Sequence, residues 1–410
     1  MTLDTRKIVY ALRHPLWASD RLLRRAVSSW QYLTRNCGSP ERCAQRLRQA
    51  VGETGDTLFV FPVPSVAWGY LLQRPQQMAR ALSKLGHTVL YGADVRYGGV
   101  PDRLVRGVLR LSDGPVLYAD GRGGRMIASL KRPVVCWQYW PHQSGFRRNL
   151  PPHSQLIYDC LDDLSTFEPY PGIESDHAET LTRADLVIAS SSRILENLRP
   201  MRRDAVLVPN AGWYDDFAFP RPCPFPKLDV LRRRSRVIVG YFGALGRWLD
   251  WRLLEELAAR RRGWTFLLVG DIMTDASAPA RLLRQKNMRI WPRQPYSRLG
   301  RLLSAFDVAI IPFLVDTLTE SVSPIKLFEY MAGGKPVVST PLAECGKYPV
   351  VRIARSPEEF VHQIEWCLGP GRSQEHRDRL QACARENTWT ARAKAVIEVL
   401  HAKGILEDHR

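Results

Sequence analysis

The sequence predicts an α/β protein built from two Rossmann-like doubly wound domains. From residue 57 onward, short apolar runs alternate with helical patterns, which is typical of a parallel sheet wrapped by helices. The Pro-rich stretch Phe219–Pro226 interrupts this alternation, and a second series of the same kind follows it. A chain of 410 residues with 45% hydrophobic residues is long and apolar enough to form two packed domains.

Each series supplies enough apolar runs for one sheet. In the first series we expect a helix over Arg74–Leu85, closed by Gly86. The expected strands of the first series are Leu58–Val63, Thr88–Tyr91, Pro133–Trp137, Leu156–Tyr158, Leu186–Ala189 and Val206–Val208. Those of the second series are Val237–Phe242, Thr265–Val269, Met288–Ile290, Val308–Ile311, Pro336–Ser339 and Val350–Ile353. We therefore expect an N-terminal domain over 51–215, a linker over 216–235 and a C-terminal domain over 236–387.

Residues 1–50 form a basic extension ahead of the first domain. Within Ser19–Arg35, apolar residues such as Leu23, Val27 and Trp30 fall at helical spacing, and arginines flank them. This pattern is typical of a helix lying on an anionic membrane surface. It is equally compatible with a helix that packs on the protein's own core and exposes a basic face.

The composition limits the classes of function. The formal net charge of +18 favours anionic partners, which include nucleic acid, phosphorylated substrates and acidic membranes. Eight cysteines stand singly, without the spacing of a zinc site or a disulfide framework. No apolar run is long enough to cross a bilayer, and no secretory signal pattern is present, so we expect a cytoplasmic protein.

Two segments of the second series carry residues suited to a phosphorylated ligand. Gly243-Ala244-Leu245-Gly246-Arg247 follows a strand, where glycines let backbone amides approach a phosphate. It fits neither the dinucleotide-binding fingerprint nor the P-loop. Lys326 and Glu329 share one face of a helix that starts near Pro324 and ends at Gly333-Gly334. The lysine suits a diphosphate and the carboxylate suits ribose hydroxyls, although an ordinary surface ion pair would give the same spacing.

This second segment resembles the donor-site signature of nucleotide-sugar glycosyltransferases with the GT-B fold, especially the family 4-like bacterial enzymes that build capsules, exopolysaccharides and surface glycans. The matching residues are Lys326-x-x-Glu329-Tyr330-Met331-Ala332-x-Gly334-Lys335-Pro336-Val337-Val338. Further matches, in the expected order, are Gln73–Gln77, Tyr158–Asp163, Val208–Gly212, Gly240–Ala244, and Phe306–Asp307 before Ile311–Phe313. The resemblance implies two facing Rossmann-like domains with a cleft between them, and a helix over 388–410 that crosses back to the N-terminal domain.

The resemblance also implies where the substrates bind. The donor, a nucleotide-diphosphate sugar and most simply a UDP-sugar, is expected on the C-terminal domain at Gly243, Arg247, Arg293, Tyr296, Ser323, Ile325, Lys326 and Glu329. The acceptor, a glycan or lipid-linked glycan, is expected on the N-terminal domain at Trp68, Tyr70, Gln73 and Arg74. Such enzymes work at the inner face of the cell membrane, which agrees with the basic extension.

The chain departs from the signature at two positions. The glutamate usually found eight residues before the ribose-binding one is replaced by Ser321, next to Glu320. Ala244 stands after Gly243 in place of the usual arginine, so Arg247 and Lys326 are the expected diphosphate ligands. The missing glutamate belongs to the pattern of retaining enzymes. The sequence therefore leaves both stereochemical outcomes open, inversion and retention.

Glycosyl transfer needs positive charge for the leaving diphosphate and, in an inverting reaction, a base for the acceptor hydroxyl. Asp159, Asp162 and Asp163 follow a strand in an acidic segment, and we select Asp162 as the base, with His142 as the alternative. Each aspartate fits equally well as a turn residue. We expect no metal and no other cofactor, because arginine and lysine can supply the charge and no Asp-x-Asp motif ends a strand.

Two other classes of protein fit some of these features. A GT-B epimerase would share the donor site and lack a separate acceptor. A nucleic-acid-binding protein would explain Arg232–Arg236 and Arg260–Arg262, but no nucleic-acid motif accompanies these basic runs.

Overall fold

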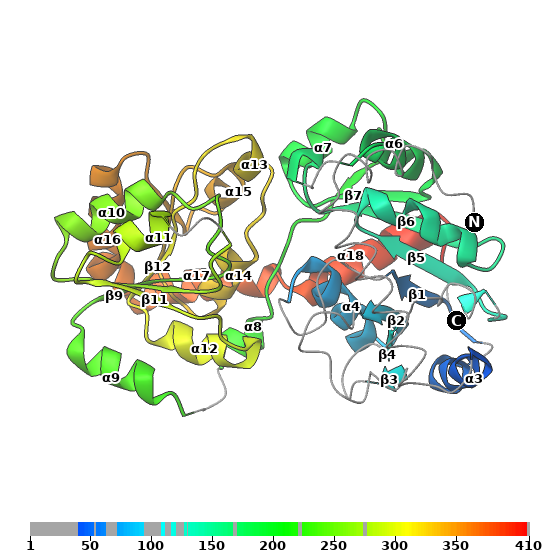
Figure 1. The fold of residues 1–410 in the computed structure, drawn as a ribbon, viewed down its shortest axis with the longest axis horizontal. Helices are drawn as coiled ribbons and strands as arrows, with labels where there is room; N and C mark the ends of the chain where they lie inside the picture. Colours follow the sequence, from blue (N-terminus) through cyan, green and yellow to red (C-terminus); the bar gives the residue numbers. More distant parts are fainter. Residues whose placement is uncertain are drawn as a thin grey trace. The chain divides into compact units, whose positions relative to one another are not determined.

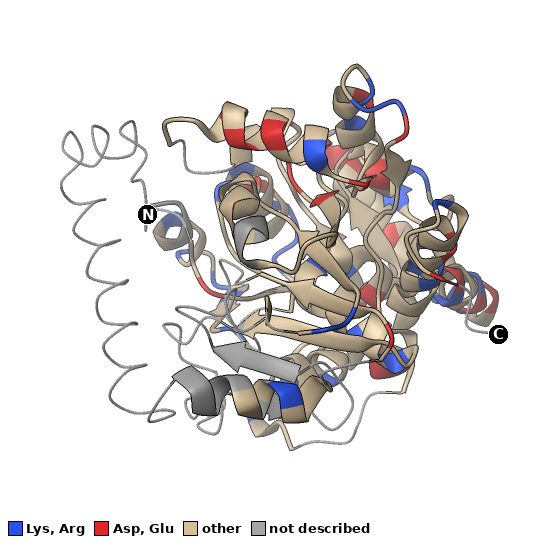
Figure 2. Cartoon of the chain, turned by 90° about the vertical axis from the view of Figure 1, so that its right-hand side faces the viewer, with Lys and Arg blue, Asp and Glu red and all other residues tan. Residues whose placement is uncertain are grey.

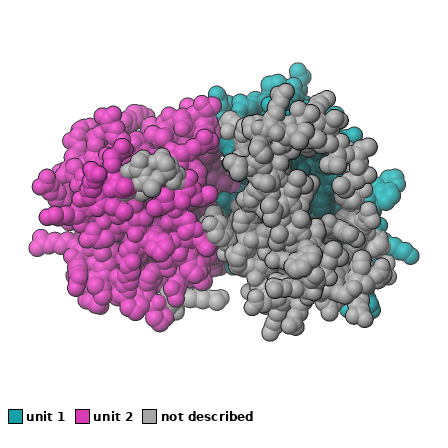
Figure 3. Space-filling model, viewed as in Figure 1, with its two compact units in different colours: residues 1–208, 393–410 teal, residues 209–392 magenta. Residues whose placement is uncertain are grey.

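The computed structural model describes residues 40–52, 55–62, 72–93, 108–110, 116–119, 127–128, 130–166, 170–219, 224–273 and 277–407. The chain divides into two compact units (Figure 3). Unit 1 comprises residues 1–208 and 393–410, and unit 2 comprises residues 209–392. The basic amphipathic segment Ser19–Arg35 lies outside the described residues.

The described residues of unit 1 form one eight-stranded sheet in the order β3-β4-β2-β1-β5-β6-β7-β8. Its strands are β1 Leu58–Phe61, β2 Thr88–Ala93, β3 Val108–Arg110, β4 Val116–Ala119, β5 Val134–Gln138, β6 Gln155–Cys160, β7 Leu186–Ala189 and β8 Val206–Leu207. All strand pairs are parallel except β3–β4, at one edge. Strands β1, β5 and β7 are buried along their whole length, which explains why their sequences are apolar apart from Gln138 at the end of β5.

Helices lie on both sides of this sheet (Figure 1). They are α3 Pro40–Val51, α4 Arg74–Lys84, α6 Ile173–Arg183 and α7 Ser192–Leu198, with the 3-10 helices η2 Pro141–Asn149 and η3 Leu164–Thr166. α4 begins at Arg74, as the sequence predicts, with a proline in its first turn, and Gly86 with φ 93° follows its end.

The described residues of unit 2 form a six-stranded sheet in the order β11-β10-β9-β12-β13-β14. Its strands are β9 Ile238–Phe242, β10 Thr265–Val269, β11 Met288–Trp291, β12 Val308–Ile311, β13 Val337–Ser339 and β14 Arg352–Ile353, and all are paired in parallel. With β9 counted first, this is the strand order 3-2-1-4-5-6 of a Rossmann domain. The prediction of two Rossmann-like domains is confirmed.

Unit 2 carries helices on both faces of its sheet, with α10 and α16 on one face and α12 on the other (Figure 1). The helices are α8 Tyr214–Ala218, α9 Pro226–Arg234, α10 Trp251–Arg260, α11 Ser277–Leu282, α12 Tyr296–Ser304, α13 Thr317–Glu320, α14 Ile325–Ala332, α15 Ala343–Gly346, α16 Pro357–Leu368, η4 Pro370–Arg372 and α17 Gln374–Glu386. The last helix, α18 Trp389–Ala402, contains the boundary between the two units.

The stretch expected as a linker, 216–235, holds the end of α8 and all of α9. Phe217, Phe225 and Leu228 from this stretch are buried in the core of unit 2. The described part of this stretch therefore contributes side chains to the core of unit 2, and unit 2 begins earlier, at Pro209.

Charged residues lie mainly on helices and loops, while strands seen in this view carry few (Figure 2). Each unit buries its own apolar cluster around its sheet. Within the described part of the chain, no helix combines the length and apolar character needed to span a membrane.

Candidate functional site

The candidate donor site lies at the carboxyl end of the unit 2 sheet, between β9 and β12. These two strands are neighbours at the point where the strand order reverses, and ligands of doubly wound sheets bind beyond the carboxyl ends at such a point. Gly243 follows β9 directly with φ 136°, a backbone conformation that L side chains rarely adopt. A Cβ at this position would lie 2.9 Å from Cε of Lys326, so the glycine leaves room for the lysine.

Lys326 lies in the first turn of α14 and extends over two aromatic rings. Its Nζ is 5.2 Å from the centroid of the Tyr241 ring and 4.9 Å from that of Phe313. It makes no hydrogen bond or ion pair within the described part of the chain. Desolvation by burial lowers the pKa of Lys326 to about 8, although the charge of Glu329 acts in the opposite direction.

Glu329 follows Lys326 by one helical turn and is only 5% exposed. Desolvation by burial raises the pKa of its carboxyl to about 8; nearby Lys326 opposes this rise, and Asp216 adds to it. The carboxylate forms no hydrogen bond with any other residue that the structure describes. A buried carboxylate is costly unless it is paired, so this group is suited to accept hydrogen bonds from a ligand's hydroxyls.

The N-terminus of α14 offers further polar groups beside Lys326. Pro324 occupies the N-cap position, and no side chain caps the helix there. Ser323 is 4% exposed, and its Oγ has no hydrogen-bond partner among the described residues. Ile325, the first residue of α14, is half-buried. The uncapped N–H groups of α14, the buried hydroxyl of Ser323 and the ammonium of Lys326 are together suited to bind an anion.

The other expected donor residues lie on neighbouring loops of the same sheet edge. Arg247 is exposed on the loop that follows β9. Arg293 follows β11, and its Nε donates to Oδ2 of Asp271, 3.1 Å away, beyond the end of β10. Tyr296 begins α12, and its ring meets that of Phe217 edge to face at 5.7 Å. All eight expected donor residues thus belong to unit 2.

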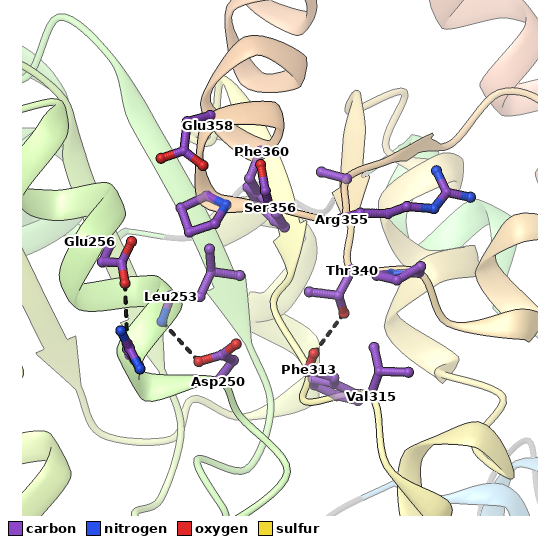
Figure 4. Close-up of a pocket in the computed structure, with 14 residues that line it drawn as sticks. Asp250, Leu253, Glu256, Phe313, Val315, Thr340, Arg355, Ser356, Glu358 and Phe360 are labelled. Carbon is purple, nitrogen blue, oxygen red and sulfur yellow. Dashed lines mark hydrogen bonds and ion pairs between the residues drawn. The ribbon is translucent and has the colours of Figure 1, made fainter.

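A pocket of about 550 Å³ borders this site through Phe313 (Figure 4). The ends of β12, β13 and β14 and the starts of α10 and α16 line it. Two of its polar side chains form hydrogen bonds with the backbone of the protein. Asp250 accepts from the backbone N–H of Leu253 at 2.8 Å, and Thr340 donates to the carbonyl of Phe313 at 2.7 Å. None of its 14 lining residues is a candidate from the sequence.

The side chain of Arg74, an expected acceptor residue, is buried in the interior of unit 1. Its Nε lies 2.9 Å from both carboxylate oxygens of Asp159, and Nε1 of Trp137 donates to the same carboxylate at 3.0 Å. Arg74 is 2% exposed and Asp159 is fully buried. Burial raises the pKa of Asp159, against the effect of Arg74 and both hydrogen bonds. The structure therefore gives this pair a place in the core, away from solvent.

Asp162 is half-buried on the loop that follows β6. Desolvation raises the pKa of Asp162 to about 6; Arg74 opposes this rise, and Asp163 adds to it. Asp163 accepts from Nδ2 of Asn197 at 3.2 Å. His142 is exposed in η2 and stacks on the ring of Trp140 at 6.0 Å.

The remaining acceptor candidates lie on the loop before α4. Gln73 precedes the helix, and its backbone N–H donates to Oε1 of Gln76 at 3.1 Å. Trp68 and Tyr70 lie outside the described residues.

Sequence reasoning missed three side chains beside the donor site. Tyr241 and Phe313 hold Lys326, but aromatic residues at strand ends look like ordinary core residues in a sequence. Asn210 donates from Nδ2 to the carbonyl of Ser323 at 2.7 Å. Asn210 lies within Val208–Gly212, a segment that resembles the glycosyltransferase pattern. This resemblance was the only feature of the sequence that could have pointed to Asn210.

In the described part of the chain, no three histidine, cysteine, aspartate or glutamate side chains come together as a metal site would require. The expectation of metal-free chemistry rests on the lysine and arginine residues described above.

Residues 236–369 match the model of the family described as Glycosyl transferases group 1. The fold is also that of solved glycosyltransferases. HepE from Anabaena, in complex with UDP and glucose, has a TM-score of 0.62 and 13% identity, with 85% of this chain and 100% of that chain covered. Residues 236–369 are thus similar to the group 1 glycosyl transferase domain, and the chain has the GT-B fold.

A curated relative agrees with this assignment. The chain is similar to the "Putative teichuronic acid biosynthesis glycosyltransferase TuaH" of Bacillus subtilis (strain 168), at 27% identity over 269 residues. The alignment covers 60% of this chain and 66% of the relative, which is just under two thirds of the relative's length. A second solved structure with this fold is sucrose-phosphate synthase from Thermosynechococcus elongatus, with a TM-score of 0.61, 15% identity, and coverage of 86% of this chain and 100% of that one.

The matched region contains every donor residue expected from the sequence, from Gly243 to Glu329. It belongs entirely to unit 2.

Proposed function

We propose that this glycosyltransferase transfers a sugar from a UDP-sugar to a glycan or lipid-linked glycan acceptor during synthesis of a bacterial cell-surface polysaccharide. The arrangement of Lys326 and Glu329 carries the proposal. One turn of α14 presents an ammonium without a carboxylate partner and a buried carboxylate without a hydrogen-bond partner, as far as the described residues extend. A nucleoside diphosphate supplies the complement of each, since its diphosphate is anionic and its ribose carries two hydroxyls.

The nucleotide and the pathway are suggested by the similar proteins. The HepE structures hold UDP, UDP-glucose, or UDP with glucose. The curated relative bears a name from teichuronic acid biosynthesis. We therefore assign UDP as the nucleotide of this chain and a cell-surface glycan as its product.

In the proposed reaction, the bond between the anomeric carbon and the β-phosphate oxygen breaks, and UDP leaves with the electron pair. A bond forms between the anomeric carbon and the acceptor oxygen, which loses its proton. Lys326, the uncapped N–H groups of α14 and Arg247 stabilise the charge that develops on the leaving diphosphate. These groups supply the charge that a divalent cation supplies elsewhere, so we propose a metal-independent reaction.

In an inverting reaction, Asp162 takes the proton from the acceptor hydroxyl. A base with a pKa of about 6 is largely ionised at neutral pH and still binds a proton more readily than an ordinary aspartate. Asp159 is fully buried and bound by Arg74, so it orders the core behind this loop. His142 is the alternative base.

The acceptor of such a reaction is built at the cytoplasmic face of the membrane, and we propose that the protein attaches there as a peripheral protein. The net charge of +18 favours an anionic membrane surface.

Incubation with a panel of UDP-sugars tests the proposed function. We expect release of UDP and transfer of the sugar to an extract of lipid-linked or free glycan, and Lys326→Ala should reduce both. Formation of an epimeric UDP-sugar without an acceptor would instead indicate a nucleotide-sugar epimerase. Absence of binding to every nucleotide sugar would refute the donor site.

A further inference from the structure

A short segment at the start of unit 2 contacts the candidate donor site from outside its expected residues. Nδ2 of Asn210 donates to the carbonyl oxygen of Ser323 at 2.7 Å, although the two residues are 113 positions apart. Ser323 precedes Pro324 and α14. Both residues belong to unit 2, so the bond lies within one compact unit.

Gly212, two residues later, packs against α14 itself. A Cβ at this position would lie 3.1 Å from Cβ of Phe328 and 3.4 Å from the backbone nitrogen of Glu329. These distances leave little room for any side chain. The segment therefore contacts the loop before α14 and also the middle of the helix that carries both donor residues.

The segment has a firm anchor of its own. The backbone N–H of Gly212 donates to the carbonyl of Asn387 at 3.1 Å, and the N–H of Trp389 donates to the carbonyl of Gly212 at 3.1 Å. Trp389 is fully buried. Contacts from Asn210 and Gly212 can thus fix α14 relative to the rest of unit 2.

The loop before α14 needs such support. Pro324 has no N–H to donate, and no side chain caps the helix at this position. The Asn210 amide is a side-chain donor that reaches this loop from a distant part of the sequence. If it were lost, the Ser323 hydroxyl and the first-turn N–H groups of α14 would be less precisely placed.

We propose that Asn210 is a positioning residue of the donor site, which holds the 321–324 loop in the conformation that binds the diphosphate. This inference rests on the proposed function. Asn210 acts through Ser323 and α14, so it need not touch the nucleotide itself. Its loss should therefore weaken recognition of the β-phosphate more than recognition of the nucleoside.

The test compares UDP with UMP in calorimetric titrations of the full chain. For Asn210→Ser we expect the dissociation constant of UDP to rise about 10-fold, as the loss of one hydrogen bond would give. The constant of UMP should change less than about 2-fold. Asn210→Asp keeps the shape but cannot donate, and it should show the same selective loss if the serine variant does not fold.

Asn287 offers a matched control. Asn287 lies just before β11, at the amino ends of the strands, whereas the candidate donor site lies at their carboxyl ends. Its Nδ2 donates to the carbonyls of Ala258, Arg261 and Trp264, each at 3.1 Å. Asn287→Ser should lower the melting temperature of the protein, but it should leave the ratio of the UDP and UMP dissociation constants unchanged.

A second comparison tests the route through Ser323. In a Ser323→Ala background, Asn210→Ser should weaken UDP binding less than it does in the wild type, because part of what it positions is gone. Equal losses for UDP and UMP, or an unchanged UDP constant in a folded Asn210 variant, would overturn the inference while the proposed function stands. Failure of the wild type to bind UDP would overturn both.

Discussion

The ammonium of Lys326 lies 4.9 Å from the centre of the Phe313 ring. An aromatic face attracts a cation without neutralising it, in contrast to a carboxylate partner. The lysine is therefore held in place while its charge stays available to an anionic ligand. A side chain that is partly desolvated and still charged is suited to the diphosphate of the proposed donor.

Removal of either donor residue should weaken nucleotide binding. We expect Lys326→Ala and Glu329→Ala each to reduce the binding free energy of UDP by about 1.5 to 3 kcal/mol, the range for hydrogen bonds to charged groups. Calorimetry measures this directly. Lys335→Ala is the control, because its Nζ donates to the carbonyls of Ser304 and Phe306 at 2.9 and 2.8 Å, before β12. UDP affinities equal to that of the wild type in both donor-site variants would remove the assignment.

Nucleotide binding should be linked to protons. Burial lowers the pKa of Lys326 to about 8, so above that pH much of the free lysine is neutral, and a bound diphosphate draws a proton onto it. Glu329, whose pKa is raised to about 8, should release a proton to accept ribose hydroxyls. The two effects oppose each other in the wild type.

Single variants separate these effects. At pH 8 to 9, Glu329→Gln should take up protons with UDP, and its affinity should fall as the pH rises. At pH 7 to 8, Lys326→Gln should release protons with UDP. Calorimetry in buffers of different ionisation enthalpy gives the sign, and heats independent of buffer in both variants would contradict the linkage.

The proposed base predicts a loss of turnover without a loss of donor affinity. Asp162→Asn should reduce kcat by roughly 100-fold or more, since a general base acts in the transition state. In the wild type, kcat/KM should rise as Asp162 ionises around pH 6. Asp163→Asn is the control. If Asp162→Asn retained normal turnover while His142→Ala lost it, His142 would be the base.

The buried pair of unit 1 predicts an effect on stability. Arg74→Met should lower the free energy of unfolding by about 3 to 5 kcal/mol, because it leaves the Asp159 carboxylate buried without its cation. Without Arg74, the folded-state pKa of Asp159 rises further above its unfolded value of about 3.9. The deficit should therefore be largest near neutral pH and shrink as the pH falls.

Urea denaturation at two pH values measures this deficit. The double variant Arg74→Met/Asp159→Leu should recover part of the loss, because both buried charges are then absent. A deficit that does not change with pH would indicate a different cause, such as lost packing around Trp137.

The proposed membrane attachment is tested with vesicles. The protein should co-sediment with anionic but not zwitterionic vesicles, and salt should weaken the attachment. Replacement of Arg21, Arg24, Arg25 and Arg35 by Gln should release it without unfolding. Equal binding of this variant would place the membrane surface elsewhere on the protein.

The fold was largely predictable because strands such as β1, β5, β7, β9 and β12 are buried along their whole length. Each expected strand overlaps an observed one, and Leu186–Ala189, Thr265–Val269 and Val308–Ile311 match to the residue. The sequence analysis missed β3 and β4 at the edge of the unit 1 sheet. β3 has three residues and β4 has four, and runs this short give little periodic pattern to recognise.

The donor helix was predictable for a different reason. Lys326 and Glu329 are close in sequence, so helical periodicity alone places them on one face. The pair of Arg74 and Asp159 is 85 residues apart and depends on the neighbouring places of α4 and β6, which no local pattern encodes. The same holds for Asn210 and Ser323. Contacts between distant segments are fixed by topology, and the sequence alone offered only the family resemblance as a guide to them.

The final segment of the chain has a consequence for synthesis. Residues 393–410 belong to unit 1, while residues 209–392 form unit 2, so the ribosome delivers the last piece of unit 1 only after all of unit 2. Val396 and Leu400 on this piece are fully buried. During synthesis, the apolar surface of unit 1 that contacts Val396 and Leu400 therefore stays uncovered until these residues are made. Unit 2 can complete its core earlier, because its residues are consecutive in the sequence. If translation stopped near residue 392, unit 2 would be folded and unit 1 would lack its last segment, which would leave apolar side chains exposed to chaperones.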